Sequence, residues 1–268
     1  MTPCLRTLAL QALTLCDPQQ KCHQVQSLWD KLCAGTLQVN PALSLVADTP
    51  IPGRPERPAL VPPGQVKHRA MNTAEGRAAL IHALAHIEFN AINLALDAVW
   101  RFSGMPADYY RDWLQVAKEE AYHFSLLREH LQTLDFDYGD FDGHNSLWEM
   151  AEKTQSDVLA RMALVPRTLE ARGLDASPPL KKKLAQAGDH AAAAILDIIL
   201  RDEIGHVAIG NRWFQFLCDQ RDLELLSTFE SLRQQYQAPK LRPPFNMEAR
   251  KLAGFTEAEL AYLNAEPF

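Results

Sequence analysis

Apolar residues recur every three or four positions near the start of the chain and then give way to a proline-rich stretch. Residues 1–35 predict two short helices, the second opening at Asp17-Pro18, where a capping aspartate precedes proline at the first helical position. Residues 39–66 contain seven prolines and cannot form a helix. Because apolar residues are spread through this stretch, we expect an extended strap that packs on the protein, with a flexible linker as the alternative.

Helical periodicity then continues almost to the C-terminus. It predicts long helices over about 73–102 and 107–134, a third over about 146–172 that Pro166 kinks, and a helical stretch from Ser177-Pro178-Pro179 to about 220, broken near Gly188. A helix over about 223–236 and one or two short helices follow, with a capping-box pattern at Thr256-Glu257-Ala258-Glu259. No stretch shows convincing period-two alternation, so the chain is predicted to be all-α.

Loop lengths indicate how these helices are organised. The first two long helices are joined by a few residues and must be antiparallel neighbours. The acidic loop over 135–145 lacks calcium-loop spacing, so we expect a solvated connection, long enough for a crossover to the third helix. The predicted segments are an N-terminal helical extension (1–38), the proline-rich strap (39–72), a four-helix bundle (73–220) and a C-terminal helical extension (221–268).

Two E-x-x-H motifs place ionisable side chains in the middle of apolar helices. In Glu120-Ala-Tyr-His123 and in Glu203-Ile-Gly-His206, the glutamate and the histidine share one helix face. A single motif of this kind means little. Each one, however, has a glutamate one helix upstream, because Glu88 lies 32 residues before Glu120 and Glu170 lies 33 residues before Glu203. A Glu…E-x-x-H pattern that occurs twice at this spacing is rarely a coincidence.

The surroundings of these glutamates indicate that they face a core. Glu170 lies in a less clear stripe than the other three, and Glu149 and Glu152 are rivals on the same predicted helix. The matched spacing favours Glu170. The other three glutamates have apolar residues on both sides at helical spacing, where an unneutralised carboxylate is costly.

Four glutamates and two neutral histidines carry four negative charges, which two divalent metal ions would cancel. Di-iron and di-manganese proteins of the ferritin-like class use this ligand set, one Glu from each of two helices and an E-x-x-H from each of the others. Oxygen-rich ligation suits iron, with manganese or a mixed pair as the alternative, better than structural zinc. The predicted ligands are Glu88, Glu120, His123, Glu170, Glu203 and His206.

The residue before each E-x-x-H motif is also acidic. In bundles of this kind such a carboxylate can accept the second N–H of the opposite helix's histidine and fix its tautomer. We therefore expect Asp202 to orient His123 and Glu119 to orient His206. The alternative is that both are ordinary surface acids.

Composition and net charge limit the classes of binding partner and the cellular compartment that we expect. The chain has 268 residues, a net charge of -6 and a pI of about 5.8, so general affinity for nucleic acid or for an anionic membrane is not expected. Five cysteines form no C-x-x-C pair, which favours a reducing compartment. The N-terminal apolar segment is too short to span a bilayer and lacks a signal-peptide pattern, so we expect a cytoplasmic protein.

Several runs of the sequence resemble a bacterial ferritin-like family of unknown function, over about residues 5–255. They are HALAHIEFNAINLALDAVWRF, KEEAYHFSLLREHL, LEARGLD, RDEIGHVAIGNRWF and FNMEARKLAGF. The resemblance implies a dinuclear metal centre in a helical bundle and leaves the substrate unassigned. The tRNA-hydroxylating di-iron proteins look like more distant relatives that share the Glu-Ala-Arg context of Glu170, but the acidic balance here argues against an RNA substrate.

These observations favour an oxidoreductase that activates O2 or peroxide with two irons and oxidises a small organic substrate, supplied with electrons by a separate donor. A ferroxidase without an organic substrate is the second hypothesis, and a tRNA-hydroxylase-like enzyme or a metal-free helical scaffold are further ones. We expect a monomer or a dimer.

Overall fold

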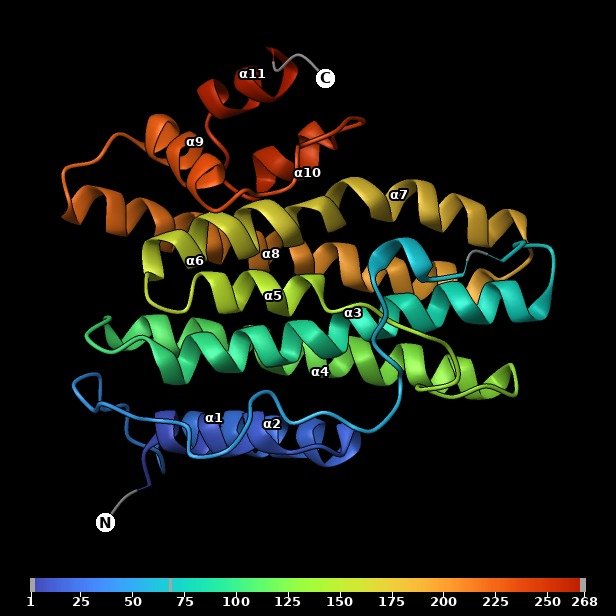
Figure 1. The fold of residues 1–268 in the computed structure, drawn as a ribbon, viewed down its shortest axis with the longest axis horizontal. Coiled ribbons are helices and arrows are strands. Elements are labelled where there is room, and N and C mark those ends of the chain that lie inside the picture. Colours follow the sequence, from blue (N-terminus) through green and yellow to red (C-terminus); the bar gives the residue numbers. More distant parts are fainter. Residues whose placement is uncertain (1–2, 68, 266–268) are drawn as a thin grey trace. The chain divides into compact units, whose positions relative to one another are not determined.

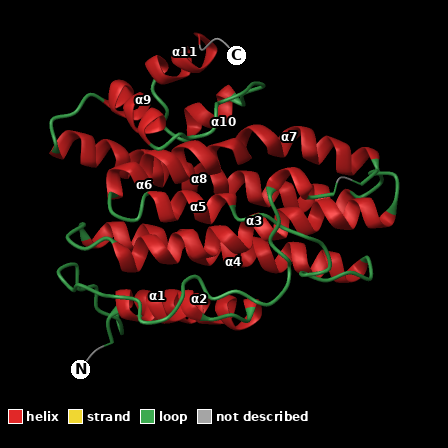
Figure 2. Cartoon of the chain, in the orientation of Figure 1, coloured by secondary structure: helices red, strands yellow, loops and turns green. Residues whose placement is uncertain are grey.

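The computed structural model describes residues 3–67 and 69–265, whose regular structure is helical, with no β-strand among them (Figures 1 and 2). The prediction of an all-α protein is therefore confirmed. The chain divides into two compact units, a first unit over residues 1–148 and a second unit over residues 149–268.

The first unit begins with two short helices and continues with two long ones. α1 (Leu5–Thr14) and α2 (Pro18–Cys33) are the expected N-terminal helices, and the Asp17 carboxylate caps α2 by accepting a 2.7 Å hydrogen bond from the N–H of Gln20. α3 (Ala74–Arg101) begins after the Thr73 cap, α4 (Ala107–Thr133) follows it, and α5 (Ser146–Lys153) crosses the boundary between the units.

α3 and α4 are antiparallel neighbours, as their short connection predicts. α1 packs on α3, and α2 packs on α4. Both long helices bury apolar side chains, among them Ile81 and Ile92 of α3 and Val116 and Leu127 of α4, which are fully buried. Burying one such side chain contributes about 1.5–3 kcal/mol, so apolar burial is a main source of stability in the first unit.

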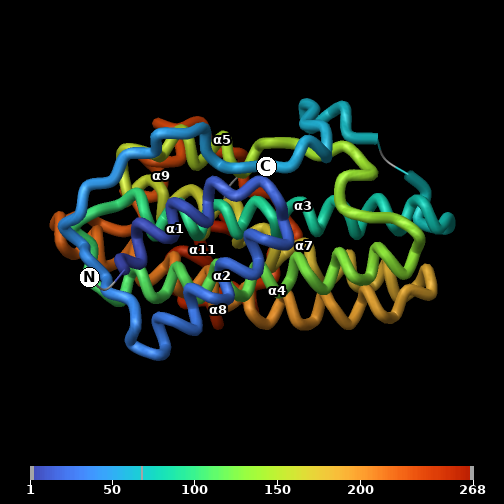
Figure 3. The backbone as a smooth tube through the Cα atoms, turned by 90° about the horizontal axis from the view of Figure 1, so that it is seen from below, coloured from blue at the N-terminus to red at the C-terminus, as the bar shows by residue number. Residues whose placement is uncertain are grey.

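Arg6 connects the proline-rich strap to the end of α3. Its side chain is fully buried and donates hydrogen bonds to five main-chain carbonyl groups. Three of these belong to the strap and two to α3: Asn40, Pro41, Leu43, Val99 and Trp100. Figure 3 shows the strap running beside α1 and α2. Residues 39–66 are therefore a packed strap, with one short 3-10 turn (Pro63–Gln65).

Lys21 fixes the strap at a second point. Its buried ammonium group donates to the carbonyl groups of Leu13 (3.2 Å) and Gly53 (2.9 Å) and to the side-chain oxygen of Asn93 in α3. A Cβ atom at position 53 would lie 2.1 Å from the carbonyl oxygen of Thr14, so only glycine allows the strap to approach α1 this closely.

The acidic loop between α4 and α5 differs from the solvated connection that its composition predicts. Phe141 is buried, and the Tyr138 hydroxyl lies 2.9 Å from Nδ1 of His86. The N–H of Gly139 donates a 2.9 Å hydrogen bond to Nε2 of His82. Both histidines are buried on α3, so the loop supplies the polar partners that a buried imidazole needs.

In the second unit, α6 (Val158–Leu164) continues through η2, a π-helical segment (Val165–Glu170), into α7 (Ala171–Gln186). α8 (His190–Gln220) packs against all three. α9 (Leu225–Gln235), α10 (Met247–Leu252) and α11 (Glu257–Ala265) complete the unit. The predicted capping box is confirmed, because the N–H of Thr256 donates to Oε2 of Glu259 (2.8 Å) and the N–H of Glu259 donates to Oγ1 of Thr256 (3.2 Å).

Two sequence-based helix boundaries in this unit are wrong. The predicted helix over 146–172 is divided into separate segments, and α7 runs straight through Pro178 and Pro179, where a new helix was expected to open. Pro178 has no N–H to donate to the carbonyl group of Leu174 four residues before it. The side-chain amide of Asn246 donates to that carbonyl group at 3.2 Å instead, so a residue distant in sequence compensates for the proline.

α3 is long and apolar enough to cross a membrane by length and composition alone, with a mean hydropathy of 1.3 over its most apolar window. The chain itself buries 72% of that window, and the core helix of a soluble protein passes the same test.

We predict that Arg6→Ala lowers the free energy of unfolding by about 3 kcal/mol, because five carbonyl groups lose a charged donor. The strap should become sensitive to limited proteolysis under native conditions. Arg111→Ala, which removes an exposed arginine of α4, is the matched control and should change neither quantity. Equal resistance of the Arg6 variant and the control would show that the strap is held by other contacts.

Candidate metal centre

The first unit brings together three of the predicted ligands. Glu88 lies in the middle of α3, and Glu120 and His123 lie one turn apart on α4, all three buried. Nδ1 of His123 is 3.4 Å from Oε2 of Glu88 and 3.4 Å from Oε2 of Glu120. One ligand atom from each of the three residues lies within 4.8 Å of the others, a spacing at which they could hold one metal ion.

The electrostatics of this cluster are unfavourable without a cation. Burial, and then the neighbouring charge of Glu120, raise the pKa of Glu88 well above its ordinary value, and contact with His123 offsets this only in part. The Oε2 atom of Glu88 is buried, and the nitrogen nearest to it is Nδ1 of His123 at 3.4 Å. Two carboxylates and a histidine are hard oxygen and imidazole donors of the kind that bind iron or manganese, so the residues present fit such an ion.

The second unit contains the matching motif. Glu203 and His206 are buried on α8, and Nδ1 of His206 lies 3.8 Å from Oε2 of Glu203. As in the first unit, the histidine turns its Nδ1 atom toward the glutamate one turn before it. Glu170 is the last residue of the π-helical segment; its side chain is partly exposed, but its Oε2 atom is buried.

Glu170 also differs clearly from its two rivals. Glu149 and Glu152 of α5 are both exposed to solvent, so neither faces a core. The preference for Glu170 therefore agrees with burial within its unit, although the sequence pattern did not reveal that a π-helical turn presents it. The signal available was Pro166, which predicts a disturbed helix at this point.

The two acidic residues that precede the motifs are both partly buried. Nε2 of Gln115 donates a 3.1 Å hydrogen bond to Glu119, one turn further along α4. Asp202 accepts two hydrogen bonds, of 2.8 and 3.0 Å, from the guanidinium of Arg201. Their expected roles in orienting the histidines of the opposite helix stay predictions.

Two buried histidines lie on a second face of α3, and their partners in the acidic loop could not be predicted from the sequence. His82 and His86 are neutral at pH 7, because burial lowers the pKa of each to about 4. Nε2 of His86 lies 2.9 Å from the carbonyl oxygen of His144 and therefore carries the hydrogen, so Nδ1 accepts from the Tyr138 hydroxyl. These histidines serve the packing of the loop on α3 and form no part of the Glu88 cluster.

Comparison with known proteins places the chain in a family. It belongs to the family described as "Protein of unknown function (DUF455)", whose profile matches residues 14–261. It is also similar to an uncharacterized protein of Haemophilus influenzae, with 49% identity over 261 residues that cover 94% of this chain and 91% of that protein. No solved structure matches the chain. The residues that match the family contain both Glu…E-x-x-H patterns, the strap, α9, α10 and the first turn of α11.

The charge of Glu88 gives a prediction for the metal-free protein. Glu88→Gln keeps the shape of the side chain and removes its charge, so the melting temperature should rise by at least about 2 °C, the shift that about 1 kcal/mol produces in a chain of this size. Glu129→Gln, at an exposed position on α4, is the control.

The pH dependence follows from the raised pKa. A group whose pKa is higher in the folded than in the unfolded state contributes stability below its unfolded pKa, and this is lost as pH rises through its folded pKa. The gap in melting temperature between Glu88→Gln and the wild type should therefore widen from about pH 5 to about pH 8. A gap in melting temperature that narrows with rising pH, or that the Glu129 control reproduces, would contradict a raised pKa for Glu88.

Proposed function

We propose that helices α3 and α4 and the helices of the second unit that carry Glu170, Glu203 and His206 form one ferritin-like four-helix bundle around two metal ions. The observation that carries the proposal is the buried cluster of Glu88, Glu120 and His123, with its raised carboxylate pKa. The recurrence of a buried, Nδ1-facing E-x-x-H pair in the second unit supports it. A dinuclear site of this class takes an E-x-x-H pair and one further glutamate for each metal ion, and Glu170 would be the further glutamate of the second unit.

The metal-binding residues would contribute different donor groups. Each E-x-x-H pair offers one carboxylate and one imidazole nitrogen, and Glu88 and Glu170 offer the remaining carboxylates. When bound, two ferrous ions, or manganese in their place, would supply the electrons that reduce O2 or peroxide. The chain itself provides negative charge, imidazole nitrogens and a dry surrounding, since Trp113, Phe124 and Leu127 are buried on the same helix as Glu120.

We propose an oxidoreductase that acts on a small organic substrate and receives electrons from a separate donor. A ferroxidase would use the same metal ligands. The two functions differ in the substrate that is oxidised, which is ferrous iron in a ferroxidase and an organic molecule in the oxidoreductase. A net charge of -6 disfavours the RNA substrate of the tRNA-hydroxylating proteins.

The first test is metal content. After anaerobic reconstitution with ferrous iron, the wild type should bind about two ions per chain, and Glu120→Ala and His206→Ala should each lose at least one of them. Glu129→Ala and His190→Ala replace exposed residues of the same types on the same helices and should bind as the wild type does. A folded wild-type protein that remains free of metal would overturn the proposal.

The second test separates an oxygenase from a ferroxidase or storage protein. With two ferrous ions bound, oxygen should be consumed once per reduced pair and no further until a reductant is added. The measurement is an anaerobic iron titration followed by oxygen addition, with the assembly mass followed by light scattering. Uptake of tens of irons per chain into a large assembly would favour storage instead.

A further inference from the structure

Glu170 ends a stretch of backbone that needs support. The π-helical segment η2 has one residue too many for a regular α-helix, a geometry that is rare and is found mostly at functional sites. The hydroxyl of Thr168 donates to the carbonyl group of Ala163 at 2.8 Å, five residues back. A Cβ atom at Gly210 would lie 2.4 Å from Cβ of Pro166, so α8 approaches the segment at a glycine.

Relaxation of this segment would move Glu170. If the extra residue were absorbed into regular α-helix, the residues at the end of the segment would rotate by about 100° around the helix axis, the angle per residue of an α-helix. Glu170 would then leave the face on which η2 presents it. Whatever holds η2 therefore also holds the direction of the Glu170 carboxylate.

Arg167 is the side chain that ties η2 to the C-terminal helices. It is buried, and its Nη2 atom donates to Oε1 of Glu259 in α11. Its guanidinium carbon lies over the rings of Phe214 in α8 (4.3 Å), Phe229 in α9 (4.9 Å) and Phe255 before α11 (5.3 Å). The planar guanidinium can stack on rings and pair with a carboxylate at once, which a lysine cannot reproduce.

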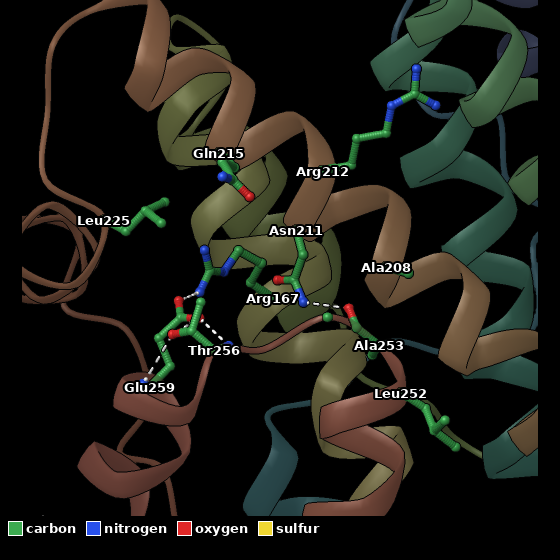
Figure 4. A pocket seen from close by; sticks show the side chains of 11 residues that line it. Arg167, Ala208, Asn211, Arg212, Gln215, Leu225, Leu252, Ala253, Thr256 and Glu259 are labelled. Atoms are coloured by element: carbon green, nitrogen blue, oxygen red, sulfur yellow. Dashed lines mark hydrogen bonds and ion pairs between the residues drawn. The ribbon is translucent and has the colours of Figure 1, made fainter.

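A pocket of about 220 Å³ opens beside this ion pair (Figure 4). Arg167 and Glu259 form part of its wall, together with Asn211, whose side-chain amide donates a 2.7 Å hydrogen bond to the carbonyl group of Ala253. The pocket gives a small cation a path to the position of the guanidinium.

We infer that Arg167 is a positioning residue for the metal centre: its ion pair with Glu259 holds η2 in the π-helical form that directs Glu170 toward a metal ion. The inference rests on the proposed function, because it assigns Glu170 a ligand role. It also assigns a role to the C-terminal extension, because α11 contributes the Glu259 carboxylate that pairs with Arg167.

The first test uses the metal-free protein and hydrogen–deuterium exchange. In Arg167→Ala, the amides of residues 165 and 167–170 should exchange at least tenfold faster than in the wild type, whereas amides in the middle of α8 should be unchanged. Glu259→Gln removes the charge of the partner with little change in shape and should give the same pattern if the alanine variant does not fold.

Arg250→Ala is the matched control. Arg250 is equally buried and also ties the C-terminal region to the helices, but its partners lie in α7, at the Asp175 carboxylate (2.6 Å) and the carbonyl group of Ala171 (3.3 Å), rather than within residues 165–170. In Arg250→Ala, hydrogen–deuterium exchange should become faster around α10 and α7, and residues 165–170 should stay as protected as in the wild type.

The second test measures ferrous-ion binding in the same variants. Arg167→Ala and Glu259→Gln should bind one of the two ions at least tenfold more weakly, and Arg250→Ala should bind both as the wild type does. Millimolar guanidinium, which fits the pocket and the vacated position, should restore the second ion to Arg167→Ala, and methylammonium should not.

The outcomes distinguish this inference from the proposed function. If the wild type holds two ions but the Arg167 and Glu259 variants match Arg250→Ala in exchange or binding, the positioning role is wrong and the dinuclear centre stands. If the folded wild type holds no metal, the proposed function and the role of Arg167 toward Glu170 fall together.

Discussion

Ionisable groups buried among apolar helices are the constraint on which both units depend. Four buried cations find their partners within their own units: Arg6 and Lys21 bind main-chain carbonyl groups and a side-chain amide, and Arg167 and Arg250 bind carboxylates. Each of these cations connects an extension to a long helix. A buried cation is costly by itself, so each one ties its partners to a single arrangement.

The buried carboxylates of α3 and α4 follow a different rule. Glu88 is buried beside Glu120, a group of the same charge, and burial, followed by that neighbouring charge, raises the pKa of Glu88. An arrangement that stability alone would not maintain is expected at a functional site, where a ligand compensates for it. The same helices are otherwise close-packed and apolar, and this makes the cluster conspicuous.

Local features could be predicted from the sequence, and non-local ones could not. The caps at Asp17 and Thr256 depend on residues within one turn, and both appear as the sequence indicates. The E-x-x-H pairs follow from helical periodicity alone. The path of α7 through Pro178 depends on Asn246, far along the chain, which periodicity cannot reveal.

The acidic loop is a second feature whose non-local contacts were not predicted from the sequence. Its aspartates indicate solvent, and one of them, Asp137, does pair with Arg128 at the surface. The decisive residues are the aromatic ones between them, because Tyr138 and Phe141 meet two histidines of α3 that lie more than fifty residues earlier. The acidic average composition of the loop predicted exposure to solvent, whereas the aromatic residues Tyr138 and Phe141 indicate that the loop packs on the protein.

The way in which the strap is held has a consequence for divergence within the family. Arg6 and Lys21 bind the strap through carbonyl oxygens of the main chain, which every amino acid possesses. Side chains of the strap can therefore be replaced over evolutionary time without loss of these bonds, provided that the two cations and the close approach at Gly53 are kept. The path of the strap is therefore determined chiefly by residues outside it, in α1 and α2. The amino-acid sequence of the strap itself is free to change under other selective pressures.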